Sequence, residues 1–316
     1  MRVLFAGSPE IALPSLEAVV AAGHEVVAVL TNPPSPKGRG LGLSPTPVAL
    51  AAERLGIPVL SPERLGPAER EAVAALAPEL LVVFAYGRIF GPKFMALFPL
   101  GGLNAHPSLL PRWRGCAPIP YAILNRDGTT GVSVQRVAPR MDSGDVLARR
   151  EIALDGSETT ESLSALSAAI GAELLVEAIA SIAAGTDSGE PQDESAATYC
   201  AALTKEEGLV DWSAPALDID ARVRAYHPWP GAFTYFAGER LSVLAARPYP
   251  GDGLGTASGT GAGTVVSVDK SKGIMVQTGE GLIALARLQL RGKRPMDFKD
   301  FANGARGLVG ARLGAS

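Results

Sequence analysis

Chemically capable side chains gather in the stretch Asn104-Ala105-His106-Pro107-Ser108-Leu109-Leu110-Pro111, where an amide and an imidazole stand two positions apart after a short apolar run. A carboxylate follows thirty-six residues after His106, in the turn-forming sequence Met141-Asp142-Ser143-Gly144-Asp145. An amide, an imidazole and a carboxylate that meet at one point can stabilise a developing oxyanion and move a proton. The trio Asn104, His106 and Asp142 therefore predicts acyl transfer without a covalent intermediate.

Each member of the trio also has a simpler interpretation when it is taken alone. An Asn at a strand end often forms a turn, a lone His is often structural, and Asp and Gly are common in ordinary turns. Only the combination of the three favours a catalytic site. Asp145 and Cys116 are interpreted as structural, the first in the turn and the second in packing.

Strand-like and helix-like segments alternate in the first 110 residues and must position this trio. Short apolar runs predict strands at residues 3–6, 26–30, 57–60, 80–84 and 103–105. Helices are predicted from Pro14, over residues 47–55 and over residues 67–76. This alternation predicts an α/β fold whose Rossmann-like, mostly parallel sheet has helices on both faces. Ligands bind beyond the carboxyl ends of such strands, and Asn104 and His106 fall at one of these ends.

The first turn, Gly7-Ser8-Pro9-Glu10, argues against a dinucleotide-binding protein. The GxGxxG fingerprint needs further glycines so that the backbone can approach a pyrophosphate, and Pro9 also removes an amide donor. We therefore do not expect NAD to bind. Residues 32–47 hold five prolines and three glycines, which predict a long, mobile loop over the mouth of the sheet.

The pattern changes in the second half of the chain. A strand at residues 146–152 and a long Ala-rich helix from residue 157 to about residue 183 complete a predicted first domain, residues 1–184. Residues 185–207 lack periodicity and predict a linker. Short strand-like runs between Gly-rich turns then predict a smaller C-terminal β-barrel, OB-like, over residues 208–316.

Composition limits the class of protein. The two cysteines cannot form a disulfide framework, and with three scattered histidines they predict no metal site. No apolar run approaches the length of about 20 residues that spans a bilayer, so we expect a cytoplasmic protein with no membrane contact. We also expect a monomer. Residues 208–316 hold 13 Lys and Arg residues against nine Asp and Glu residues, which permits contact with a polyanion.

Six segments together carry a family resemblance. They are residues 5–9, 85–87, 104–115, 141–145, 203–207 and 227–231. In combination they resemble the methionyl-tRNA formyltransferase family, nearly end to end. The first four are shared by the wider group of enzymes that use 10-formyltetrahydrofolate, so they indicate the chemistry, whereas the last two and the barrel point to transfer RNA.

The resemblance implies transfer of the formyl group of 10-formyltetrahydrofolate to the α-amino group of methionine on initiator transfer RNA. Asn104 and His106 are then expected to face the oxyanion. His106 and Asp142 would share the proton transfer, with Asp142 paired to His106 and fixing its tautomer. The sequence leaves open which of the two moves the proton.

The resemblance also implies binding residues. The slot for the folate pterin ring would be lined by Phe84, Tyr86, Gly87, Ser108, Leu109, Leu110 and Pro111. Arg88 departs from the family pattern, in which an uncharged residue usually follows the Tyr-Gly pair. Contacts to transfer RNA are expected from Lys37, Arg39, Arg291, Lys293 and Arg294, although the 35–43 loop carries Leu41 and Gly42 where basic residues are usual.

Two other functions compete with this prediction. One is another 10-formyltetrahydrofolate-dependent enzyme, a hydrolase or a formyltransferase for an aminosugar nucleotide, against which the second domain argues. The other is a non-catalytic RNA-binding module, for which residues 1–207 offer little basic surface and the trio would be unnecessary.

Overall fold

The computed structural model of the 316-residue chain describes residues 1–37, 42–249 and 260–314. The chain forms two compact units, each of which is described by itself. The first comprises residues 1–118, 129–153 and 163–201, and the second comprises residues 119–128, 154–162 and 202–316. The domain boundaries expected at residues 184 and 208 stay a prediction, whereas the contacts group residues 185–201 with the first unit.

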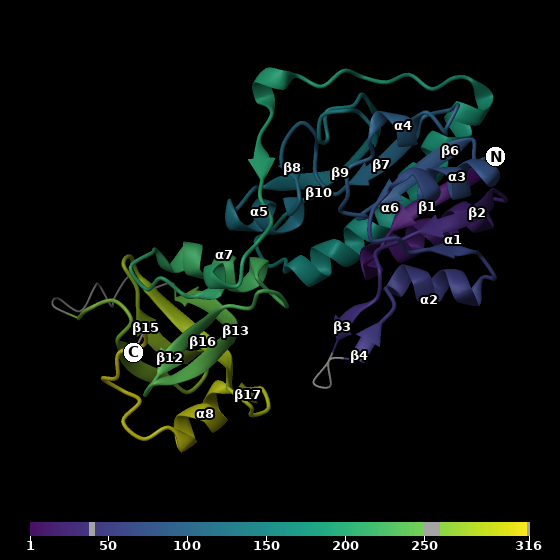
Figure 1. Ribbon diagram of the computed structural model, residues 1–316. Helices are drawn as coiled ribbons and strands as arrows, with labels where there is room; N and C mark the ends of the chain where they lie inside the picture. The colour runs from purple at the N-terminus through teal and green to yellow at the C-terminus, as the bar shows by residue number, and fades with distance from the viewer. Residues whose placement is uncertain (38–41, 250–259, 315–316) are drawn as a thin grey trace. The chain divides into compact units, whose positions relative to one another are not determined.

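A seven-stranded sheet organises the first unit, in the order β10-β9-β7-β6-β1-β2-β5 (Figure 1). Its parallel strands are β1 (Arg2–Gly7), β2 (Glu25–Leu30), β5 (Val59–Leu60), β6 (Leu80–Phe84) and β7 (Gly102–His106). Two antiparallel strands, β9 (Thr129–Arg136) and β10 (Val146–Ala153), extend the sheet beyond β7. The sequence predicted β10 but missed β9.

Strand β1 shows why the sheet has helices on both faces. Successive side chains of a strand point to opposite faces, and every side chain from Val3 to Ala6 is fully buried. Val3 and Phe5 pack into one hydrophobic cluster, while Leu4 and Ala6 pack into another. A continuous apolar run is therefore the expected pattern for this strand.

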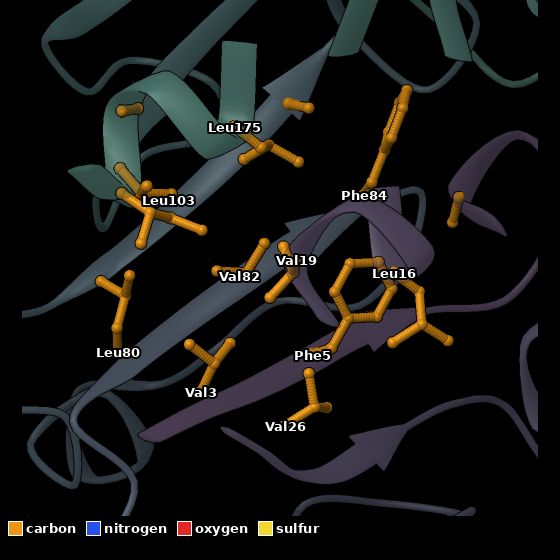
Figure 2. Close-up of a cluster of buried hydrophobic side chains, with 14 of the residues drawn as sticks. Val3, Phe5, Leu16, Val19, Val26, Leu80, Val82, Phe84, Leu103 and Leu175 are labelled. Atoms are coloured by element: carbon orange, nitrogen blue, oxygen red, sulfur yellow. The ribbon is translucent and has the colours of Figure 1, made fainter. Parts of the chain in front are cut away.

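The two clusters correspond to the two faces of the sheet. Helices α1 (Leu13–Ala21), α2 (Pro47–Arg54) and α6 (Thr160–Ala184) contribute side chains to the first cluster. Figure 2 shows this cluster, with Leu16 and Val19 of α1 and Leu175 of α6 over the strands. Helices α3 (Pro67–Ala75) and α4 (Pro92–Met95) supply Val73 and Phe94 to the second.

Helix α6 is long and apolar enough to cross a membrane by length and composition. Half of its most apolar window is buried inside the protein, however, and Leu174, Leu175 and Ile179 pack in the core of the first unit. These contacts explain its apolar composition as that of a core helix.

The second unit is built on an antiparallel sheet in the order β12-β13-β16-β15-β14, with β17 paired to β16. The strands are β12 (Phe233–Phe236), β13 (Glu239–Tyr249), β14 (Val265–Asp269), β15 (Gly273–Gln277), β16 (Leu282–Leu290) and β17 (Met296–Asp297). Helices α7 (Ala216–Ala225) and α8 (Phe298–Gly304) bury Ile219, Val223 and Phe301 in the same core as the sheet. The expected fold class, a Rossmann-like α/β domain followed by a smaller β-barrel-type domain, is confirmed.

Shorter elements complete the chain. Short 3-10 turns lie at Glu10–Ala12, Glu194–Ala196 and Glu206–Gly208. Helix α5 spans Pro118–Leu124, and β8 (Arg114–Gly115) pairs in parallel with β11 (Tyr199–Cys200). Within the predicted 32–47 loop, β3 (Ser35–Lys37) and β4 (Gly42–Ser44) pair as a short antiparallel ladder, so part of this segment is regular.

Candidate active site

The carboxyl end of β7 and the loop after β9 bring the predicted trio together. Asn104 and His106 are the third and fifth residues of β7. Asn104 is directly opposite Gln135 in the antiparallel register with β9. The loop after β9 then returns to the sheet through Asp142, whose φ of 51° is a left-handed conformation that Asp adopts more readily than most residues.

The carboxylate of Asp142 is at the centre of the site. Its Oδ1 accepts a hydrogen bond of 2.9 Å from Nε2 of Gln135 and a longer one of 3.4 Å from Nδ2 of Asn104. Its Oδ2 accepts a hydrogen bond of 2.9 Å from the backbone N–H of Gly115 and lies 3.7 Å from Nδ1 of His106. Donors on both oxygens therefore fix the carboxylate in one orientation.

His106 is held from its other side. Its side chain is 6% exposed, and Nε2 lies 2.8 Å from the carbonyl oxygen of Trp113. A carbonyl oxygen only accepts hydrogen bonds, so Nε2 must carry the proton. In the neutral ring Nδ1 is then unprotonated and directed toward Asp142, at a separation too long for a direct hydrogen bond.

This geometry corrects one detail of the expected arrangement. We expected Asp142 to fix the tautomer of His106, but the Trp113 carbonyl does so by accepting from Nε2. The correction has a chemical consequence, because a proton taken up at Nδ1 would create an imidazolium between a carbonyl and a carboxylate. Both groups stabilise the positive charge.

The segment after His106 is fixed by two buried serines. Ser108 Oγ donates to the carbonyl of Arg112 at 2.6 Å, and Ser133 Oγ donates to the carbonyl of Ser108 at 2.8 Å. The backbone N–H of Leu110 donates to Ser133 Oγ at 3.1 Å. Ser108 and Leu110 are buried, while Leu109 and Pro111 are half-buried. These four residues thus form a rigid edge beside His106.

The other predicted slot residues differ in what they expose. Phe84 is the last residue of β6, and its ring is buried in the core of the first unit (Figure 2). Tyr86 is 1% exposed and stacks on Phe90, and its backbone carbonyl accepts from Nδ2 of Asn32 at 3.1 Å. Burial raises the pKa of the Tyr86 hydroxyl. Gly87, at φ 78°, is exposed at the turn that follows.

Arg88 lines a pocket of about 600 Å³ that opens next to this turn. Nη1 of Arg88 donates to the carbonyls of Pro62 and Glu63 at 2.9 and 2.8 Å, which anchors the guanidinium to the segment before α3. Three further cations line the same pocket, namely Arg64, Arg70 and Lys93, against one carboxylate. The pocket is therefore suited to an anion, although the trio itself is not part of its lining.

Comparison with known proteins decides the family. The Formyl transferase family matches residues 1–179, and Formyl transferase, C-terminal domain, matches residues 202–306. A methionyl-tRNA formyltransferase of Treponema pallidum (strain Nichols) is 46% identical over 322 residues, which cover 99% of each chain. The chain belongs to the methionyl-tRNA formyltransferase family. Relatives of the same name from Treponema denticola and Methylococcus capsulatus are 44% and 42% identical, over 96% and 99% of this chain and 97% and 100% of theirs.

Solved structures show the same fold at low sequence identity. HypX from Aquifex aeolicus in complex with tetrahydrofolic acid matches with a TM-score of 0.62 and 18% identity, over 98% of this chain and 48% of that one. An N-formyltransferase from Helicobacter canadensis in complex with folinic acid and dTDP-3-aminofucose matches with a TM-score of 0.64 and 17% identity, over 90% and 98%. This methionyl-tRNA formyltransferase family member thus has the formyltransferase fold throughout.

The basic residues expected to contact transfer RNA are placed unevenly. Arg291, Lys293 and Arg294 are exposed in the turn between β16 and β17, and within residues 260–314 they form no ion pair. Lys37 ends β3, whereas Arg39 lies outside the described residues. The barrel turn of this family member therefore offers three positive charges within residues 291–294 to a ligand.

Sequence reasoning missed several residues of the site. Gln135 is a polar residue on β9, whose run of β-branched residues could have predicted a strand. Arg114 is 1% exposed, and Gln192 lies in the segment predicted to be a linker. The backbone groups of Trp113 and Gly115 left no sequence signal. Residues 113–115 belong to a segment that carries the family resemblance, but their contacts with the trio and with Gln192, like Gln135 and Gln192 themselves, were identified only in the structure.

The two cysteines take no part in these contacts with Asp142. Cys116 is exposed, while Cys200 is buried and its Sγ accepts from the backbone N–H of Ala117 at 3.3 Å. Burial raises the pKa of the Cys200 thiol to about 11, so this thiol is protonated near neutral pH. In the described residues, no three His, Cys, Asp or Glu side chains gather as a metal site would require.

Proposed function

We propose that this protein transfers the formyl group of 10-formyltetrahydrofolate to the α-amino group of methionine carried by initiator transfer RNA. The observation that carries the proposal is the 42–46% identity to methionyl-tRNA formyltransferases over nearly the whole of both chains. The arrangement of Asn104, His106 and Asp142 supports it with a site suited to acyl transfer. The product would serve translation initiation, and we expect a cytoplasmic monomer.

The chemistry assigns distinct tasks to the three side chains. A bond forms between the amine nitrogen and the formyl carbon, and the bond from that carbon to N10 breaks. The amine loses a proton and N10 gains one. We assign the uptake of the amine proton to Nδ1 of His106, because Nε2 already carries a proton for the Trp113 carbonyl. Asp142, 3.7 Å from Nδ1, stabilises the resulting imidazolium.

Asn104 is assigned to the oxyanion. Its amide nitrogen carries two hydrogens, and one of them makes only the long 3.4 Å contact with Asp142. The other hydrogen is available to the oxygen of the tetrahedral centre. A donor fixed before the reaction costs no reorganisation at the moment when charge develops.

Binding of the folate is assigned to the residues around the Tyr86 turn. Backbone groups of residues 84–87 and 108–111 would contact the pterin edge, as recognition of a polar ring edge in an apolar slot requires. The glutamate end of a folate carries carboxylates, and the pocket lined by Arg88, Arg64, Arg70 and Lys93 would receive them. In this assignment Arg88 is a binding residue, which accounts for a charge at that position.

Contact with transfer RNA is assigned to Lys37, Arg39, Arg291, Lys293 and Arg294. The three barrel residues are exposed and close together in the chain, as phosphate contacts require. Their role is electrostatic, so it should weaken as salt concentration rises.

A direct assay tests the proposal. The purified protein is incubated with 10-formyltetrahydrofolate and methionyl-tRNA, and the product is analysed as formylmethionyl-tRNA. Parallel reactions replace the transfer RNA by an aminosugar nucleotide or by water alone. Formylation of the transfer RNA alone is the expected result. Formylation of the sugar, or release of formate, without any formylmethionyl-tRNA would reject the assignment.

A further inference from the structure

Residues 185–201 run as a long extended segment from the end of α6 to β11, within the first unit (Figure 1). This segment meets the buried guanidinium of Arg114. Oε1 of Gln192 accepts from Nε and Nη2 of Arg114 at 3.1 and 2.8 Å, and the Glu194 carboxylate accepts from Nη2 and Nη1 at 3.0 and 3.2 Å. These contacts pair the buried Arg114 side chain. Without them, the buried charge would strongly destabilise the fold.

The amide nitrogen of Gln192 faces the loop after β9 that carries Asp142. Its Nε2 lies 2.9 Å from the carbonyl oxygen of Asp142, 2.7 Å from that of Gly144 and 3.2 Å from Oε1 of Gln135. Gln135 in turn donates from Nε2 to Oδ1 of Asp142 at 2.9 Å. Gln192 therefore contacts the backbone of this loop directly and the carboxylate of Asp142 through the amide of Gln135.

Only one direction of hydrogen bonding is possible along this chain of contacts. A guanidinium only donates, while a carbonyl oxygen and a carboxylate only accept. Gln192 must therefore present Oε1 to Arg114 and Nε2 to the loop. Because Nε2 of Gln192 donates to Oε1 of Gln135, Gln135 must present its own Nε2 to Asp142. Arg114 thus sets the orientation of both amides.

We propose that Gln192 is a positioning residue for formyl transfer, which holds the carboxylate of Asp142 in place from the segment that follows the first domain's last helix. It acts directly on the backbone of residues 142–144 and indirectly through Gln135. The inference rests on the proposed function, since the reaction is its readout. A misplacement of catalytic groups by about 1 Å can cost about 100-fold in rate.

The substitution Gln192→Glu distinguishes a role in positioning Asp142 from a role in only attaching the segment to Arg114. The introduced carboxylate retains the acceptor for Arg114 but removes every donor toward Asp142, Gly144 and Gln135. We expect kcat for formylmethionyl-tRNA synthesis to fall about 10- to 100-fold. The KM values for methionyl-tRNA and for the folate should stay within about twofold, because the proposed contacts do not touch either substrate.

Asp187→Asn supplies the matched control. Asp187 lies on the same segment and pairs with Arg136, so this variant loosens the segment without touching the chain of amides. Its kcat should equal that of the parent, and circular dichroism should show that all variants are folded. If Gln192→Glu keeps the parent kcat while folded, or if Asp187→Asn lowers kcat equally, the positioning role is rejected. An inactive parent protein would instead reject the proposed function.

A double-mutant cycle covers the case in which Gln192→Glu is poorly folded. Gln135→Met removes the donor to Oδ1 of Asp142 and interrupts the proposed path. Gln192→Met introduces an apolar side chain of similar length and removes the other amide of the path. If the two act through one path, the double variant should lose much less than the product of the single losses. Fully multiplicative losses would contradict the path through Gln135.

Discussion

The Nε2 atom of His106 and the carbonyl oxygen of Trp113 lie 2.8 Å apart, and this contact determines which ring nitrogen of His106 is available for chemistry. Because the carbonyl accepts, the proton resides on Nε2 and Nδ1 is unprotonated in the neutral ring. Nδ1 lies beside Asp142, whose carboxylate is oriented by donors from Gln135 and Gly115. In the proposed reaction a backbone carbonyl therefore selects Nδ1 of His106 as the base, and the Asp142 carboxylate would stabilise the charged ring.

Replacement of Asn104 tests the assignment of the oxyanion donor. Asn104→Ala should lower kcat by roughly 10²- to 10³-fold, the usual loss for one such donor. Steady-state formylation of methionyl-tRNA measures the effect. Asn125→Ala is a suitable control, since Asn125 is exposed and its amide donates only to the carbonyl of Tyr121 in the described residues. Near-parental turnover in a folded Asn104 variant would remove Asn104 from this role.

Gly144 tests the placement of the loop that carries Asp142. A Cβ atom at Gly144 would lie 1.8 Å from the carbonyl oxygen of Arg136, so the loop must move to accommodate Ala. We expect Gly144→Ala to reduce the free energy of unfolding by about 1–3 kcal/mol, as overpacking does. Turnover should fall as well, because Asp142 moves with the loop.

Gly128→Ala is the matched control for this change. A Cβ atom at Gly128 meets nothing within 4 Å. Urea denaturation and formylation assays on both variants compare the two positions. Equal stability and activity for the two would show that the loop can accept the methyl group without displacing Asp142.

The sheet and the trio could be predicted from the sequence because their determinants are local. The apolar run from Leu80 to Phe84 fits a strand buried on both faces, and such strands end where ligands bind. Asn104 and His106 are two residues apart on one strand, so their proximity needed only the identity of that strand. Asp142 was predicted to join them, and the structure brings it to 3.4 Å from Asn104.

The contacts around Asp142 could not be predicted in the same way. Gln192 contacts Gln135 across 57 positions of sequence, from a segment without periodicity. No local pattern encodes such a contact, since it depends on how the chain returns after α6. Arg114 belongs to the segment 104–115 that carries the resemblance, but its burial depends on the distant partners Gln192 and Glu194, which no local pattern indicates.

Arg88 tests the assignment of the basic pocket. Arg88→Leu should raise the KM for 10-formyltetrahydrofolate roughly 10-fold, which is the lower end of the loss expected when a hydrogen bond to a charged group is removed. The kcat should stay nearly unchanged. The matched comparison uses a formyl donor that lacks the glutamate and its carboxylates. With this donor the parent and the variant should have similar KM values. An equal rise in KM for both donors would mean that Arg88 only shapes the pocket.

The barrel turn predicts a change in salt dependence. Each phosphate contact contributes about 0.7–0.9 to the slope of log affinity against log salt. Lys293→Ala and Arg294→Ala should each reduce that slope by about this amount in transfer RNA binding titrations. Arg54→Ala removes one positive charge from the last turn of α2 and should leave the slope unchanged. Unchanged slopes in the barrel variants would exclude these residues from phosphate contact.

Glu194 predicts a pH-dependent contribution to stability. The hydrogen bonds from Arg114 hold the pKa of this carboxyl below its ordinary value of 4.5. A carboxyl whose pKa is lowered by folding stabilises the protein fully above its unfolded pKa, and this stabilisation is lost as pH falls through the folded pKa. Glu194→Gln should therefore destabilise the protein at about pH 7 and much less at about pH 3.5, in urea denaturation. Glu190→Gln, on the same segment and paired with exposed Arg149, is the control. A difference between Glu194→Gln and the parent that stays constant across this range would contradict the ion pair with Arg114.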